Sequence, residues 1–190
     1  MIFNTVGSLI YYVCQWLMSV VIVRISGYED AGILSLAMTV TASPAIVGLF
    51  NIRSYQVSDI DGQYSNKTYI QSRMYTNLLS YLVCLVMVLA GGYSLQKAAV
   101  ILIFMLFKVA EGFADVYYGI EQKWERMDYA GISMTIRGIG TIILFVAGFL
   151  ITGSLLFSVV AIAAFSFAVI LLYDRRIVKR WETAEEKTGW

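Results

Sequence analysis

Long apolar runs recur along the whole of this 190-residue chain and constrain its fold more than any other feature. An α-helix rises about 1.5 Å per residue, so about 20 apolar residues cross a hydrocarbon core of about 30 Å. The predicted spans are residues 1–23, 31–50, 74–91, 98–116, 132–151 and 155–172. The sequence therefore predicts an all-α polytopic membrane protein with about six transmembrane helices.

The composition agrees with lipid as the solvent of this chain. Only 14% of the residues are charged, whereas a soluble domain carries about 25%. The net charge of +1 gives no basic surface for nucleic acid, and the absence of histidine removes the commonest metal ligand and near-neutral acid or base. Cys14 and Cys84 lie inside apolar runs and predict neither a disulfide nor a metal site. We therefore expect no enzyme, no metal and no cofactor.

The basic residues predict the orientation in the membrane, because lysine and arginine are enriched in cytoplasmic connections. Of the 14 lysines and arginines, 11 fall at one side of the predicted spans. The opposite side carries Arg24 and Lys97, and Lys108 lies within a span. Both termini are therefore expected in the cytoplasm. The expected organisation is a six-helix bundle over residues 1–173 and a charged cytoplasmic tail over residues 174–190.

Polar side chains follow one face of the first predicted span. They recur at steps of three or four residues, which places them on one side of a helix; they are Asn4, Ser8, Tyr11, Gln15 and Ser19. Small and polar residues often line helix–helix contacts in membranes. The alternative that we weigh equally is a water-filled cavity along this face.

The fourth span carries the strongest intrinsic signal for a site. Lys108, Glu111 and Asp115 share one helical face, and ionisable side chains at membrane depth are costly enough to suggest function. The alternative is a structural Lys108–Glu111 ion pair with Asp115 extending to the headgroups. Pro44, the one proline, interrupts the second span and predicts either a hinge or a static kink.

An Asp-x-Asp pattern at Asp59 and Asp61 matches the metal-binding motif of some glycosyltransferases. Such enzymes need a folded domain for the nucleotide, and the connection over residues 51–73 is too short to supply one. We interpret the pattern as chance. An enzyme embedded in the membrane also fits poorly with the missing histidine and nucleotide-binding motif.

Four sequence stretches together resemble a known family of transporters. They are NTVGS at 4–8, RISG at 24–27 with AG at 31–32, RSYQVSD at 53–59, and DVYYGIEQ at 115–122 followed by Ser133 and Arg137. Their order and placement resemble the polysaccharide and lipid-linked oligosaccharide flippases. That family belongs to the multidrug/oligosaccharidyl-lipid/polysaccharide exporter superfamily, whose fold is MATE-like. The resemblance extends over essentially the whole chain.

The resemblance implies a fold of two pseudo-symmetric lobes with 12 to 14 helices, of which this chain resembles the amino-terminal lobe. It implies translocation of undecaprenyl-pyrophosphate-linked oligosaccharide across the bacterial plasma membrane by alternating access. Partners would be membrane lipids and either a second six-helix lobe or a second copy. The substrate-binding residues expected on this basis are Asn4, Tyr11, Gln15, Arg24, Arg53, Lys108 and Arg137. Glu111 and Asp115 are expected to couple to an ion or to form ion pairs.

Two alternatives stay open at this stage. Glu111 and Asp115 would also suit a multidrug and toxin extrusion protein, which exports cationic compounds and would favour acidic cavity residues. The expected absence of a second lobe also allows an inactive, truncated membrane protein. Vesicle uptake of substrate would separate the two transporter hypotheses.

The predicted orientation can be tested with reporter fusions at Trp190 and at Gly92. A cytoplasm-active reporter is expected to work at Trp190, and a periplasm-active reporter at Gly92, because the basic residues concentrate at the Trp190 side. Activity of the Trp190 fusion only outside the cell would contradict the predicted helix count.

Overall fold

The structure is a computed structural model that describes residues 2–59 and 62–188, and every element in that part is helical. The helices are α1 (Ile2–Ile25), α2 (Tyr28–Leu49), a short α3 (Ile52–Ser58), α4 (Asn66–Ala90), α5 (Leu95–Lys123), α6 (Met127–Thr152) and α7 (Leu155–Val169). A π-helical turn, η1 (Ile170–Asp174), joins α7 to α8 (Arg175–Thr188). The predicted all-α fold is confirmed.

Five helical stretches are long and apolar enough to cross a membrane, and they include α1, α2, α4, α6 and the continuous α7–η1–α8 segment. The remaining long helix, α5, carries Lys108, Glu111 and Asp115 in its central turns. It is nevertheless the helix with the most buried positions, because α2, α4 and α7 all pack against it. The side chains of Lys108, Glu111 and Asp115 are half-buried. The prediction of a polytopic bundle of about six helices is confirmed.

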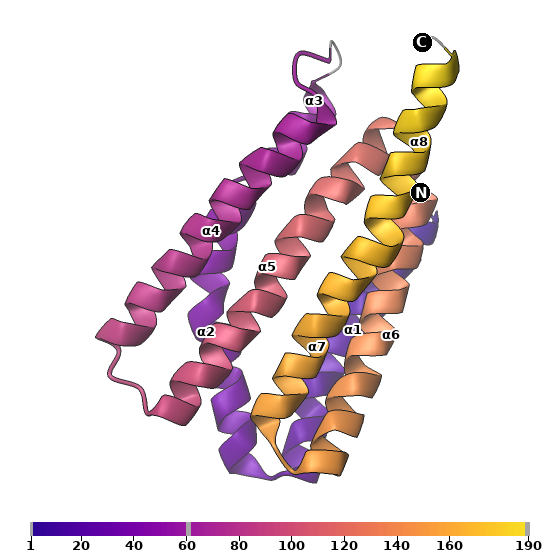
Figure 1. The fold of residues 1–190 in the computed structure, drawn as a ribbon. Helices are drawn as coiled ribbons and strands as arrows, with labels where there is room; N and C mark the ends of the chain where they lie inside the picture. The colour runs from indigo at the N-terminus through magenta and orange to yellow at the C-terminus, as the bar shows by residue number, and fades with distance from the viewer. Residues whose placement is uncertain (1, 60–61, 189–190) are drawn as a thin grey trace.

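The long helices form two sub-bundles. In one, α1 packs along α6 and α6 along α7, and in the other, α2, α4 and α5 pack against one another. The contact between α5 and α7 joins the two groups, whereas α1 with α2 and α5 with α6 touch less. Figure 1 shows α5 between α4 and α7, with both chain ends at the end of the bundle where α3 lies. A seam between the sub-bundles therefore runs along one side of α5.

Two helices begin or continue where the sequence analysis expected a connection or a tail. α4 starts at Asn66 instead of residue 74, because Ser65 caps it by accepting a hydrogen bond from the Thr68 N–H at 3.3 Å. The segment 174–190 was expected as a charged tail, and in the structure α8 extends through Thr188. Residues 189–190 lie outside the described part of the chain. The proposed boundary after residue 173 thus falls within η1.

Glycines allow α1 and α6 to approach backbone to backbone. A methyl group built on Gly7 would collide with the Gly131 carbonyl, and one on Gly131 would collide with the Phe3 carbonyl. One on Gly138 would lie 2.9 Å from the Tyr11 Cα atom. Membrane helices associate through such close packing because lipid supplies no hydrophobic driving force between them. This contact between α1 and α6 sets the position of α1 along the bundle axis, and with it the height of Tyr11.

Gly7→Ala is expected to lower the free energy of unfolding by about 2 kcal/mol, because the added methyl group forces α1 away from α6. Gly32→Ala is the matched control, since a methyl group there meets nothing within 4 Å and alanine favours the helix. Unfolding titrations with sodium dodecyl sulfate in mixed micelles would measure both. Equal stability of the two variants would contradict the glycine contact.

Candidate functional site

The polar face of α1 meets the charged face of α5 across the seam and forms a partly open cavity of about 200 Å³. α1, α5 and α6 contribute most of its wall, and the ends of α2 and α3 close one side. The lining residues are Tyr11, Tyr12, Gln15, Leu49, Arg53, Lys108, Glu111, Asp115, Tyr118, Met134 and Arg137. This set defines the candidate site.

Glu111 is the centre of one hydrogen-bonded cluster in the site. Gln15 Nε2 donates to its Oε1 at 2.6 Å, the Tyr11 hydroxyl donates to the same oxygen, and Lys108 Nζ lies 2.8 Å from Oε2. Lys108 also lies over the Phe104 ring, with 5.7 Å between Nζ and the ring centroid. Both carboxylate oxygens are therefore occupied by partners from α1 and α5.

Asp115 is the centre of a second cluster, one turn further along α5. Its Oδ2 lies 2.7 Å from Nη2 of Arg73, and its Oδ1 lies 3.4 Å from Nη1 of Arg53. Arg73 is fully buried, and its Nη1 also donates to the carbonyl oxygens of Gly48 and Leu49 at 2.8 and 2.7 Å. These carbonyls end α2 and have no partner within their own helix. One guanidinium thus caps α2 and pairs with α5.

Arg137 faces the site from α6 and is paired differently from the other cations. It is almost fully buried, and its Cζ lies 5.9 Å from the centroid of the Tyr11 ring. Two of its nitrogens, Nε and Nη2, have no hydrogen-bond partner within the described residues. Buried donors are normally bonded, so this guanidinium retains capacity for an anionic or oxygen-rich ligand.

Seven of the residues expected at a site converge on this one cavity, from four different helices. They are Tyr11, Gln15, Arg53, Lys108, Glu111, Asp115 and Arg137. Helical periodicity predicted those of α1 and α5, because polar side chains of these helices have to turn away from lipid. Arg53 and Arg137 were expected from the family resemblance. The individual roles of all these residues in binding or coupling stay predictions.

Asn4 and Arg24 do not line the cavity. Arg24 is exposed in the last turn of α1, about 13 Å along the helix from Gln15. Asn4 lies at the other end of α1, and the Ser8 hydroxyl donates to its backbone carbonyl at 2.8 Å. Periodicity placed Asn4 on the polar face of α1 but could not fix its height relative to α5. Arg24 was expected at the site only from the family resemblance.

Pro44 is buried in α2 and lies away from the cavity lining. The Ser80 hydroxyl of α4 donates to the Pro44 carbonyl at 2.5 Å. Such cross-helix bonds satisfy backbone groups near a membrane proline. This contact connects α2 to α4, and a hinge at Pro44 stays a prediction.

Several site residues escaped the sequence analysis. Arg73 was counted only as a basic residue near a membrane end, and Tyr12, Leu49 and Met134 carried no polar signal. Glu121 is also fully buried, and neither of its oxygens has a hydrogen-bond partner in the described part of the chain. It lies in the last turn of α5, next to the expected connection.

Asp59 organises the connection between α3 and α4. It accepts hydrogen bonds from the Tyr69 hydroxyl at 2.7 Å and from the Gln63 and Tyr64 N–H groups at 2.9 and 3.2 Å. The Tyr69 hydrogen bond lowers the pKa of the Asp59 carboxyl, aided by these two N–H groups and by Lys123. Asp61 lies outside the described residues. Asp59 thus has a structural role, and no group of three or more potential metal ligands occurs in the described segments.

The sequence of this chain is similar to those of proteins that are named for polysaccharide biosynthesis. A family model described as "Polysaccharide biosynthesis protein" matches residues 1–188. A Staphylococcus aureus protein named "Capsular polysaccharide biosynthesis protein CapF" is 33% identical over 171 residues, which cover 87% of this chain. The match covers 41% of the length of that relative. No solved structure matches the chain.

Asp115→Asn is expected to lower the free energy of unfolding by about 3 kcal/mol, because the buried Arg73 guanidinium then loses its counter-charge. Asp128→Asn is the matched control. It breaks the exposed ion pair with Arg126, and such pairs contribute about 1 kcal/mol or less. Thermal unfolding in detergent micelles would measure both variants, and an equal loss at the two positions would contradict a buried role for the Arg73–Asp115 pair.

Proposed function

This chain belongs to the polysaccharide biosynthesis protein family, and we propose from this premise that it acts in transport of lipid-linked polysaccharide precursors across the bacterial plasma membrane. Residues 1–190 would form one lobe of the transporter, with both termini in the cytoplasm. The activity would be translocation, without covalent chemistry on the substrate.

One observation supports an anionic substrate over a cationic one. The carboxylates of the site already have partners, Glu111 with Lys108 and Gln15, and Asp115 with Arg53 and Arg73. Arg137, in contrast, keeps two buried donors without a partner in the described residues. A guanidinium in this state suits a phosphate or pyrophosphate oxygen, which it can bind through two parallel hydrogen bonds.

The remaining polar groups suit the sugar. Tyr12 and Gln15 line the cavity beside Arg137 and supply hydrogen-bonding side chains. A volume of about 200 Å³ is smaller than an ordinary ligand pocket. The cavity would therefore hold a phosphate or one sugar ring against this lobe, while a second bundle supplies the opposite wall.

Alternating access follows from such a shared site. Two bundles that rock against each other open it first to the cytoplasm and then to the outside. The polar headgroup would cross within the cavity, since its transfer through hydrocarbon is costly. The lipid tail would remain in the bilayer throughout. The second bundle could be a further part of the same protein or a separate chain, and the curated relative is longer than the matched region.

The alternative proposal is export of cationic compounds in the manner of a multidrug and toxin extrusion protein. It would require a carboxylate in the cavity that can exchange its partner for the substrate. Glu111 accepts hydrogen bonds from Tyr11 and Gln15 as well as from Lys108. Displacing all of these donors would be costly, and the polysaccharide proposal is favoured.

The proposal predicts the outcome of complementation in a bacterial strain whose own oligosaccharide flippase is deleted. Residues 1–190 co-expressed with the carboxy-terminal lobe of a family member should restore surface polysaccharide, whereas residues 1–190 alone should not. Arg137→Gln should reduce the polysaccharide by about tenfold or more, because hydrogen bonds to charged groups contribute about 1.5 to 3 kcal/mol.

Two controls separate loss of the site from loss of the fold. Arg137→Lys keeps the charge and should retain part of the activity, while Lys97→Gln, at an exposed position far from the cavity, should retain all of it. Membrane levels and thermal stability are measured for every variant. Full rescue by Arg137→Gln, or by residues 1–190 without any second lobe, would contradict the proposal.

A further inference from the structure

A second concavity of about 580 Å³ lies on the opposite face of α5 from the candidate site. α4 and α7 both pack against α5, and the groove lies between them, with α5 as its floor. Phe113 and Tyr117 of α5 line the groove, whereas Lys108 and Asp115 line the candidate site. The helical period places these two pairs on opposite sides of α5.

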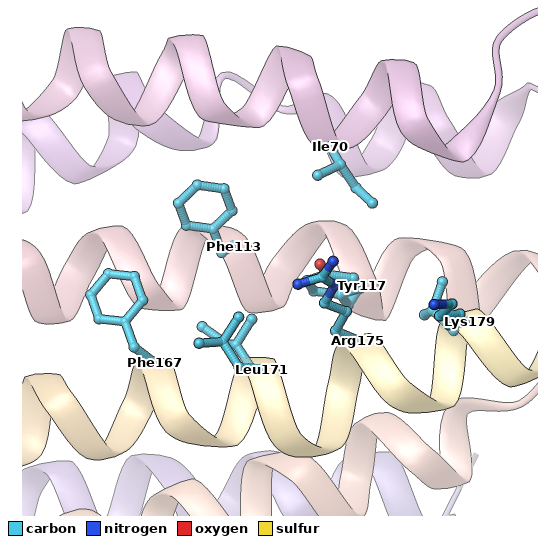
Figure 2. Close-up of a pocket in the computed structure, with 9 residues that line it drawn as sticks. Ile70, Phe113, Tyr117, Phe167, Leu171, Arg175 and Lys179 are labelled. Atoms are coloured by element: carbon cyan, nitrogen blue, oxygen red, sulfur yellow. The ribbon is translucent and has the colours of Figure 1, made fainter.

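The groove is apolar along most of its length and basic at one end (Figure 2). Phe113 of α5 and Phe167 of α7 lie at the apolar end, and Ile70 of α4 lies across the groove from Arg175 (Figure 2). Arg175 and Lys179 of α8 lie at the other end, and the two Phe rings and the Arg175 side chain all project into the space between the helices (Figure 2). A single occupant of this groove would need a hydrocarbon part and an anionic part.

The lining of the groove includes two basic side chains. No acidic side chain lines the groove, and Arg175 forms no ion pair among the described residues. Phe167 and Leu171 belong to a stretch that is apolar enough to cross the membrane. Basic pockets between transmembrane helices at the cytoplasmic side bind anionic lipid headgroups. This groove likewise lies between membrane-spanning helices and carries basic side chains at one end.

We propose that this groove binds an anionic phospholipid, with its acyl chain along Phe113, Phe167 and Leu171 and its phosphate against Arg175 and Lys179. From Phe167 to Lys179 the helix rises about 18 Å, which suits an acyl chain that ends at a headgroup. The site is distinct from the translocation cavity, and the proposal does not depend on the identity of the transported substrate.

α8 contains its own matched control. It carries a second basic pair, Arg176 and Arg180, which lies on another face beside Leu172 and lines a separate hollow. A general attraction of basic residues to anionic headgroups would act through both pairs equally. A specific lipid site requires only Arg175 and Lys179.

The test measures lipid retention by native mass spectrometry of the full chain. The protein is purified in mixed micelles that contain equal amounts of phosphatidylglycerol and phosphatidylcholine. Wild type and the R176Q/R180Q variant are expected to retain phosphatidylglycerol preferentially. The R175Q/K179Q variant is expected to lose this preference by about 30-fold, the effect of removing two basic residues near a membrane surface. Size-exclusion profiles and thermal stability are measured to establish that both double variants fold.

A second pair of variants tests the apolar part. Leu171→Trp fills the groove and should reduce retention of both phospholipids, while Leu172→Trp, on the other face, should leave retention unchanged. Equal loss of preference in the two double variants, or no loss in either, would overturn the proposal. So would a change in oligomeric state of Leu171→Trp with unchanged lipid retention, because the groove would then be a protein contact.

Discussion

The charges of α5 are the constraint on which the rest of the structure depends. Lys108, Glu111 and Asp115 lie in the central turns of a long helix, where contact with hydrocarbon would be costly. α2, α4 and α7 shield this helix, and α1 supplies hydrogen-bond donors to its remaining face. Of the helical stretches that are apolar enough to face lipid, α2, α4 and α7 thus pack closely against the long helix that is not, and α1 bonds to it through side chains. The order of helices in the bundle follows from this enclosure.

The packing of the other helices against α5 leaves a seam between the two sub-bundles, and the candidate site lies in this seam. The glycines of α1 and α6 hold one sub-bundle together through backbone contact, whereas Arg73 holds the other through hydrogen bonds and an ion pair. Neither kind of contact spans the seam at the site. Side chains cross the seam there, as Tyr11 and Gln15 do when they donate hydrogen bonds to Glu111. A ligand that competes for these side chains could reach them without breaking either sub-bundle.

The sequence predicted the helices and the inward faces well, because both follow from local periodicity and from the cost of polar groups in lipid. That reasoning predicted that Tyr11, Gln15 and Lys108 face inward, and they line one cavity. It could not fix heights along the bundle axis, which depend on packing at positions such as Gly7 and Gly131, so Asn4 lies on the polar face of α1 but outside the cavity. Arg24, which the family resemblance suggested, does not line the cavity either. The role of Arg73 was also hidden. It depends on the end of α2 lying beside α4, a contact between residues 25 positions apart.

The π-helical turn η1 has a consequence for electrostatics. Each residue of an α-helix advances the direction of its side chain by about 100°, and a π-helical turn takes up about one residue more than an α-helical turn. Side chains of α8 therefore point about 100° away from the directions that an uninterrupted α7 would give them. Without that extra residue, Asp174 and Val178 would take the directions that Arg175 and Lys179 now have. A single additional residue in one turn thus decides whether the groove ends in positive charge or in a carboxylate and a methyl-bearing side chain.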